Sequence, residues 1–218
     1  MLKIENVDVW GFKHAIRGMR NPLNSWNKSD SGYGIDGEDE DTFVIGKKDL
    51  QLMQGLYKAG SEHRKYLRQI FISMDITAPL YWWKEMDQYR INVTTNSCST
   101  MHTIHKKEFE LDDFSTDKMN TDAEGILLNV IEFLNRQRDI YLNGIHGQMI
   151  GSKEFWWNII QLLPSSYNQK RTVTMNYENV VNIIHQRIGH KLDEWNVFVG
   201  ELKNLPYVKE IMGDVETE

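Results

Sequence analysis

Apolar and polar side chains follow two different periods along the chain, and each period predicts an element type. Alternation over residues 2–10 and the short β-branched stretch 70–77 (IFISMDIT) predict strands. Apolar residues at helical spacing predict helices over 47–69, 78–90, 124–143, 152–163 and 179–199. Together these elements predict an α+β fold, with a small central sheet that includes residues 70–77 packed against long helices.

Local signals set the ends of several helices. Pro79 suits the first turn of the helix over 78–90, and Asp49 is a plausible cap or first-turn acid. Residues 18–41 are rich in Asn, Ser, Gly and Asp, which predicts a long, mobile loop. Gly189 is expected inside the helix over 179–199. We expect residues 1–218 to form a single domain.

The charge balance of the chain narrows the classes of partner that it can bind. The 218 residues carry a formal net charge of −6, and no Lys/Arg-rich run stands out. Because affinity for nucleic acid polymers depends on clustered cations, this composition argues against such a partner. A single cysteine precludes an intramolecular disulfide. We find no signal-peptide pattern and no apolar run of membrane-spanning length, so a cytoplasmic location is expected.

Several residues of the right type for chemistry lack the right surroundings. His102, His105 and Glu108 have a metal-ligand spacing, but no further ligand is near in sequence, so we expect no metal site. Cys98 has no adjacent cation to lower its pKa, so we expect no nucleophile there. In each of the pairs 82–83 and 156–157, both tryptophan, one indole should be buried and the other free for a partner or a ring-shaped ligand.

Arg187 lies in an otherwise apolar helical stretch (VVNIIHQRIGH), beside a predicted polar stripe of Asn182, Gln186 and His190. The stripe is either a solvated surface or part of a binding site. A buried guanidinium needs an anionic partner. That partner is either an anionic ligand or an acid such as Glu178 or Glu194.

Two segments together carry a family resemblance: FISMDITAPLYWWKEMDQYRINVTTNSCST (71–100) and NIIQLLPSSYNQKRTVTMNYENVVNIIHQR (158–187). In their order and spacing they resemble the flavin-dependent thymidylate synthases. That family has a strand, an Ala-Pro helix start and the signature RHRxxSxxxxSxR. A helix ending in Leu-Pro, a Thr-x-Asn and a helix with Asn and Arg follow later. The resemblance covers about a third of the chain.

The signature itself is eroded. Its leading positions fall on Gln88, Tyr89 and Arg90, so only the last basic residue is kept. The two serine positions fall on Val93 and Cys98, and the final arginine falls on Thr100. The Asn-Glu pair inside the motif becomes Thr95-Asn96. Loss of arginines from a phosphate site costs affinity, because charge-assisted hydrogen bonds are the strong ones.

The second block is better preserved. Asn176, Asn182 and Arg187 match the family, whereas an arginine that contacts the flavin becomes Glu178, and another before the Leu-Pro becomes Ile160. Glu62-His63 also resembles a Glu-His pair of the family, with a spacing several residues off.

The resemblance implies a cofactor and a substrate. FAD would contact six residues: Gln88, Tyr89, Arg90, Ile91, Asn176 and Asn182. A pyrimidine deoxynucleotide such as dUMP would contact four: Asn96, Cys98, Thr100 and Arg187. The reaction transfers a one-carbon unit from methylenetetrahydrofolate to dUMP with reduced flavin as hydride source and NADPH as reductant, so no catalytic side chain need act as nucleophile. Family members are homotetramers, and we expect the same here.

Three functions stay open at this point. The chain is an active, divergent enzyme of this family on dUMP or a related pyrimidine nucleotide. Alternatively it is a non-catalytic descendant that keeps the fold for binding or assembly. The eroded signature favours the descendant, and the retained Arg90, Asn182 and Arg187 favour the enzyme. In the third, the resemblance is accidental and the protein is an unrelated helical one.

Overall fold

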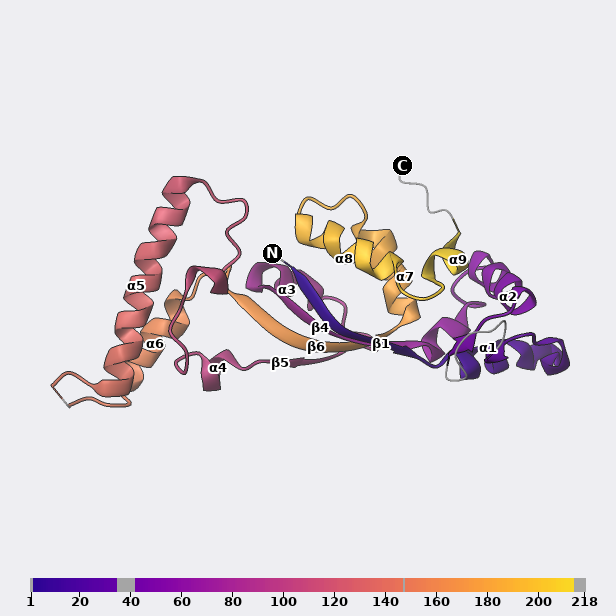
Figure 1. The fold of residues 1–218 in the computed structure, drawn as a ribbon, viewed down its shortest axis with the longest axis horizontal. Coiled ribbons are helices and arrows are strands. Elements are labelled where there is room, and N and C mark those ends of the chain that lie inside the picture. Colours follow the sequence, from indigo (N-terminus) through magenta and orange to yellow (C-terminus); the bar gives the residue numbers. More distant parts are fainter. Residues whose placement is uncertain (1, 35–41, 147, 214–218) are drawn as a thin grey trace. The chain divides into compact units, whose positions relative to one another are not determined.

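The computed structural model describes residues 2–34, 42–146 and 148–213, and Figure 1 shows the helices and strands. The strands are β1 (Lys3–Trp10), β2 (Gly32–Tyr33), β3 (Phe43–Val44), β4 (Phe71–Pro79), β5 (Thr94–Ser97) and β6 (Asn168–Asn176). The α-helices are α1 (Phe12–Arg20), α2 (Lys47–Lys58), α3 (Leu80–Met86), α4 (Thr100–Thr103), α5 (Thr121–Asn143), α6 (Lys153–Leu162), α7 (Tyr177–Arg187), α8 (Asp193–Lys203) and α9 (Val208–Met212). Short 3₁₀ turns include η1 (Asn21–Leu23), η2 (Trp26–Lys28), η4 (Lys65–Gln69) and η5 (Leu111–Asp113).

Four strands form the main sheet in the order β1-β4-β6-β5, and β2 pairs antiparallel with β3. The α+β prediction with a small sheet and long helices is therefore confirmed, and the predicted strands over 2–10 and 70–77 are β1 and β4. Strand β6 was not predicted from the sequence, because its letters (NQKRTVTMN) are mostly polar. Val173 and Met175 nevertheless bury their side chains from it, and Asn176 follows them.

The described residues group into two compact units. Unit 1 consists of residues 1–4, 76–88 and 96–172, and unit 2 consists of residues 5–75, 89–95 and 173–218. Each unit is described by itself below. The expectation of one domain over 1–218 stays a prediction.

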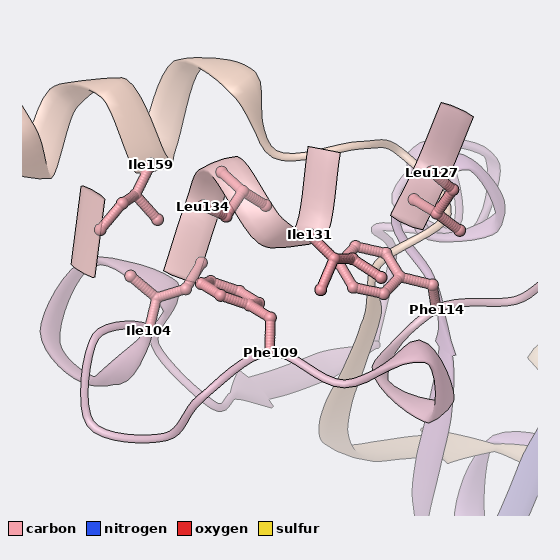
Figure 2. Packing of buried hydrophobic residues seen from close by; sticks show 7 residues of the cluster. All are labelled: Ile104, Phe109, Phe114, Leu127, Ile131, Leu134 and Ile159. Carbon is pink, nitrogen blue, oxygen red and sulfur yellow. The ribbon is translucent and has the colours of Figure 1, made fainter. Parts of the chain in front are cut away.

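In unit 1, the long helix α5 and its neighbour α6 close a core of aliphatic and aromatic side chains (Figure 2). Leu127, Ile131 and Leu134 recur at helical spacing on α5 and point to one side. Against them pack Ile159 from α6 and three residues of the segment before α5: Ile104, Phe109 and Phe114. The predicted amphipathic helix over 124–143 is confirmed and begins three residues earlier, where the Asn120 side chain accepts from the Ala123 amide.

The tryptophan pairs behave differently. Trp82 and Trp83 on α3 are both buried, so the prediction of one free indole is wrong for this pair. Trp83 donates from its ring nitrogen to the Gln169 carbonyl oxygen at 3.0 Å, which satisfies the polar end of a buried indole. On α6, Trp156 is only half-buried and Trp157 is exposed, so the exposed indole is as predicted but the prediction of a buried one is wrong for this pair.

In unit 2, helix packing centres on α7. This helix packs on α8 and on η4, while α2 packs on α9 and α1 packs on η4. The predicted helix over 179–199 is wrong in the middle, because α7 ends at Arg187 and α8 begins at Asp193. Gly189 has a φ of +69°, a left-handed conformation that a continuous helix does not contain. Consequently His190 does not continue the stripe of Asn182 and Gln186. The predicted helix over 47–69 is also divided, into α2 and η4.

The segment predicted as a long loop over 18–41 contains the end of α1, η1, η2 and β2 as far as Gly34. Residues 35–41 lie outside the described residues. What organises the described part is the buried carboxylate of Asp49, which accepts from Arg20 Nε at 2.6 Å, Ser29 Oγ at 2.6 Å and Ser31 Oγ at 2.7 Å. Burial raises the pKa of Asp49, but these hydrogen bonds outweigh it and leave the pKa below its usual value. Residues 18–34 therefore contain short regular elements, and the predicted mobility of the loop over 18–41 stays a prediction.

Asp30, which lies 18 residues before Lys48 in the sequence, caps the start of α2. Its carboxylate accepts from the backbone amides of Lys48 and Asp49 at the start of the helix. Gly46 permits the contact, because a Cβ at that position would lie 2.3 Å from Asp30.

We expect Asp49→Ala to lower the free energy of unfolding by about 3–5 kcal/mol, because it leaves the Arg20 guanidinium buried without its carboxylate. Because the folded-state pKa of Asp49 is lowered, its contribution is present above the unfolded value of 3.8 and is lost as the pH falls below it. Urea denaturation measures the loss. The control is Asp139→Ala, which removes an exposed partner of Arg138 and should cost less than about 1 kcal/mol. Equal costs for the two variants would contradict the role of Asp49.

Candidate functional site

Helix α7 starts with a reciprocal cap. The side chain of Asn176 accepts from the Asn179 amide at 3.1 Å, and the Asn179 side chain accepts from the Asn176 amide at 3.4 Å. Two backbone amides at this helix end are thereby satisfied. Asn176 is buried, so the structure gives this predicted cofactor residue a definite structural part in starting the helix.

Residues 89–91, which belong to the signature, are attached to α7 by two hydrogen bonds. Asn179 Nδ2 donates to the Ile91 carbonyl oxygen at 2.8 Å, and Arg187 Nε donates to the Tyr89 hydroxyl oxygen at 2.8 Å. Arg90 lies between these two attachment points and its side chain is exposed. Five predicted site residues in unit 2 are thus fastened to, or belong to, one helix: Tyr89, Ile91, Asn176, Asn182 and Arg187.

Arg187 lies between aromatic rings at the end of α7. Its guanidinium carbon is 4.4 Å from the ring centre of Trp195 and 5.5 Å from that of Tyr89. Its Nη1 lies 3.0 Å from His190 Nε2. Cation–π contacts of this kind stabilise a partly desolvated guanidinium and fix its plane. The position is half-buried, as the apolar neighbours in the sequence predicted.

Glu178 has a different partner from those considered in the sequence. Arg64 donates to Glu178 Oε1 from Nε at 3.1 Å and from Nη2 at 2.9 Å. The same Nη2 also donates to Asn182 Oδ1 at 3.0 Å. The alternative in which Glu178 pairs with Arg187 is therefore wrong, and the negative charge at position 178 is balanced by a cation from the segment between α2 and η4.

The same face of α7 carries His185, one turn beyond Asn182. Tyr57 on α2 places its hydroxyl oxygen 2.6 Å from His185 Nε2, and the Arg64 guanidinium stacks over the Tyr57 ring at 5.3 Å. Burial, together with the nearby charge of Arg64, lowers the pKa of His185 below 6.5. Burial raises the pKa of Tyr57. Both shifts favour the neutral forms of the two side chains that share this hydrogen bond.

The remaining predicted residues belong to unit 1. Gln88 is exposed just after α3, and Asn96 is exposed on β5. Cys98 is exposed; its amide donates to the Lys170 carbonyl oxygen at 2.9 Å and its carbonyl oxygen accepts from Gln169 Nε2 at 2.8 Å. Thr100 begins α4 and is half-buried. Strand β5 thus lies within the signature segment over residues 88–100.

Sequence reasoning missed Arg64, Tyr57 and Trp195 as parts of this site. Nothing local marks Arg64, because its partners Glu178 and Asn182 lie more than a hundred residues further along the chain. The one upstream signal that was noted, Glu62-His63, lines a separate cavity of about 780 Å³ in unit 2 together with residues of α1, η1 and α2.

Two expectations about classes of site can be compared with the described residues. Across residues 2–34, 42–146 and 148–213, no three His, Cys, Asp or Glu side chains gather as a metal ion would require. None of the described helices has the length and apolar character needed to cross a membrane.

We expect His185 to make stability depend on pH. A histidine whose folded-state pKa is lowered leaves the protein fully stable above its unfolded value of 6.5, and stability falls as the pH drops through that value. When the pH is lowered from about 7.5 to about 5.5, the melting temperature of His185→Gln should fall less than that of the wild type. His102→Gln, at an exposed position on α4, is the control and should keep the wild-type profile. Parallel profiles for all three proteins would refute the assignment.

Comparison with solved structures places the fold. Thymidylate synthase X (ThyX) from Helicobacter pylori with FAD and dUMP matches with a TM-score of 0.71 and 16% sequence identity, over 98% of each chain. A second structure of this flavin-dependent enzyme, also from Helicobacter pylori and complexed with FAD and dUMP, matches with a TM-score of 0.65 and 18% identity. It covers 96% of this chain and 98% of the other. No protein-family model and no curated protein matches the sequence. The chain therefore has a ThyX-like fold over nearly its whole length.

Proposed function

We propose that this protein is a divergent flavin-dependent thymidylate synthase-like protein that binds FAD and a pyrimidine deoxynucleotide. If it is catalytically active, the protein would methylate dUMP, or a related pyrimidine nucleotide, with methylenetetrahydrofolate, reduced FAD and NADPH. A cytoplasmic homotetramer, as the sequence resemblance implies, is part of the proposal. The observation that carries it is the attachment of segment 89–91 to α7, within a fold shared along the whole chain with enzymes solved with FAD and dUMP.

The groups around α7 suit a flavin nucleotide chemically. Nη1 of Arg64 and Nδ2 of Asn182 have no hydrogen-bond partner among the residues that the structure describes, and neither atom is enclosed. Such donors match the carbonyl, hydroxyl and phosphate oxygens of FAD. Five residues of unit 2 are proposed to hold it: Tyr89, Arg90, Ile91, Asn176 and Asn182. Gln88 is proposed on the strength of the resemblance alone. When bound, the reduced flavin supplies the hydride.

Arg187 is the residue that we propose binds the nucleotide substrate. Its guanidinium plane is fixed by two aromatic rings and by the Tyr89 hydroxyl, so little side-chain freedom remains to be lost when an anion or carbonyl oxygen is bound. Asn96, Cys98 and Thr100 are proposed for the same substrate, on the strength of the resemblance alone.

The second candidate is a non-catalytic descendant that keeps the fold for binding or assembly. One sequence feature favours it: Val93, Cys98 and Thr100 stand where the family signature has two serines and an arginine. Val93 cannot donate a hydrogen bond, and the loss of a cation weakens a phosphate site. Binding of FAD and dUMP without turnover is the result that would select this candidate.

Titration with FAD tests the cofactor. We expect the apo-protein to change the fluorescence of added FAD with a saturating dependence, and more weakly than a protein with the complete signature, because cations are missing. Isothermal calorimetry gives the same dissociation constant independently. Failure to bind at high micromolar FAD would remove the cofactor proposal, and with it the enzyme.

Arg187→Met tests the nucleotide. Met keeps the aliphatic bulk between the rings and removes the charge, so the variant should lose the thermal stabilisation that dUMP gives the wild type. Tyr89→Phe is the matched control: it keeps the Arg187 charge and removes one orienting hydroxyl, so it should bind dUMP only about 3- to 10-fold more weakly. A variant Arg187→Met that is stabilised by dUMP as strongly as the wild type would exclude the substrate role.

A further inference from the structure

The Arg64 guanidinium is oriented more tightly than its place between α2 and η4 suggests. It makes three hydrogen bonds to α7, two to Glu178 Oε1 and one to Asn182 Oδ1, at 2.9–3.1 Å. Its central carbon, Cζ, lies 5.3 Å from the ring centre of Tyr57. Tyr57 is in turn fixed by its hydrogen bond to His185. Position and plane of the guanidinium are thus set by four residues before any ligand arrives, which lowers the entropy cost of using it.

One end of this guanidinium is left available. Nε and Nη2 are used in the contacts with α7, whereas Nη1 has no hydrogen-bond partner among the described residues. Nη1 is not one of the enclosed polar atoms, and the Arg64 side chain keeps 15% of its surface exposed. Guanidinium groups have five N–H donors, so two of them remain on Nη1 for an acceptor.

The charge arrangement explains why such a residue is needed here. Position 178, where the family resemblance has an arginine toward the flavin, carries a carboxylate in this chain. Glu178 Oε2 is enclosed and has no partner, so this carboxylate contacts Arg64 through Oε1 alone. Arg64 therefore neutralises an acid that would repel an anionic ligand, and it still presents donors of its own at the first turns of α7.

We propose that Arg64 is a ligand-binding residue that donates from Nη1 to an acceptor oxygen of the bound flavin nucleotide, in place of the arginine absent from position 178. This inference rests on the proposed binding of FAD. In this chain the cation, Arg64, comes from the segment before η4, whereas α7 carries the acid, Glu178, at the position of the family's arginine. The acceptor is either a phosphate oxygen of FAD or an oxygen of its riboflavin portion.

The experiment compares variants that differ only in the Arg64 guanidinium. Arg64→Met alone would strand the enclosed Glu178 carboxylate and could unfold the site, so Glu178→Gln is included in every arm. The pair compared is Glu178→Gln against Arg64→Met/Glu178→Gln. The matched control is Arg138→Met/Glu178→Gln, because Arg138 lies on α5 in unit 1 with a similar side-chain exposure of 17% and also bonds a carboxylate and a carbonyl oxygen. Circular dichroism checks folding, and calorimetry measures binding of FAD and of riboflavin.

We expect Glu178→Gln to bind FAD at least as tightly as the wild type, because the charge of the Arg64 guanidinium is then no longer neutralised by the Glu178 carboxylate. Arg64→Met/Glu178→Gln should bind FAD about 10- to 100-fold more weakly, the loss typical of one charge-assisted hydrogen bond. The Arg138 control should match Glu178→Gln. Weakening of FAD binding alone assigns the contact to the ADP portion, which carries the phosphates, and weakening of both flavins assigns it to the riboflavin portion.

Equal FAD affinities for Glu178→Gln and Arg64→Met/Glu178→Gln overturn the inference while leaving the proposed function intact. A wild type that binds neither FAD nor riboflavin overturns the proposed function itself, and Arg64 with it. The wild-type titration therefore precedes the comparison of variants and separates the two failures.

Discussion

Burial of the apolar face of α7 is the constraint on which the candidate site depends. Val180, Val181, Ile183 and Ile184 are buried there, so the helix cannot rotate about its axis without exposing them. Because the apolar face is fixed, Glu178, Asn182 and His185 must form a stripe at helical spacing, and they meet Arg64 and Tyr57. The capping asparagines fix where the helix starts, and thereby the position of each of these side chains along the helix axis.

The cations of this site are each paired with a second, orienting group. Arg187 is held by rings and a hydroxyl, whereas Arg64 is held by a carboxylate, an amide oxygen and a ring. The ion pair of Arg64 with Glu178 is nearly neutral as a whole. Different kinds of contact therefore orient the two guanidinium groups.

The sequence predicted the fold class and the elements whose periodicity is plain. The helix containing Leu127, Ile131 and Leu134 shows a regular apolar spacing, and strand β4 shows β-branched residues in a short run. Strand β6 escaped prediction because its partners, not its own letters, bury it. The break at Gly189 was missed because one glycine inside an apolar pattern is tolerated in many helices; here its positive φ ends the helix. In the site, residues on α7 were found from the resemblance, whereas Arg64 depends on a contact across 114 positions that no local pattern encodes.

The Asp49 carboxylate has a consequence for how this part of the chain can vary. Two serine hydroxyls, the Asp30 amide and a guanidinium converge on one buried group, so their donors must be supplied together. A change at Ser29 or Ser31 to a residue without a hydroxyl removes a hydrogen-bond donor to the buried Asp49 carboxylate. Homologues that lack Asp49 should accordingly also lack Arg20 and the two serines, and the four positions should be inherited as a set. Loop grafts that carry residues 29–31 into another scaffold would need Arg20 and Asp49 to travel with them.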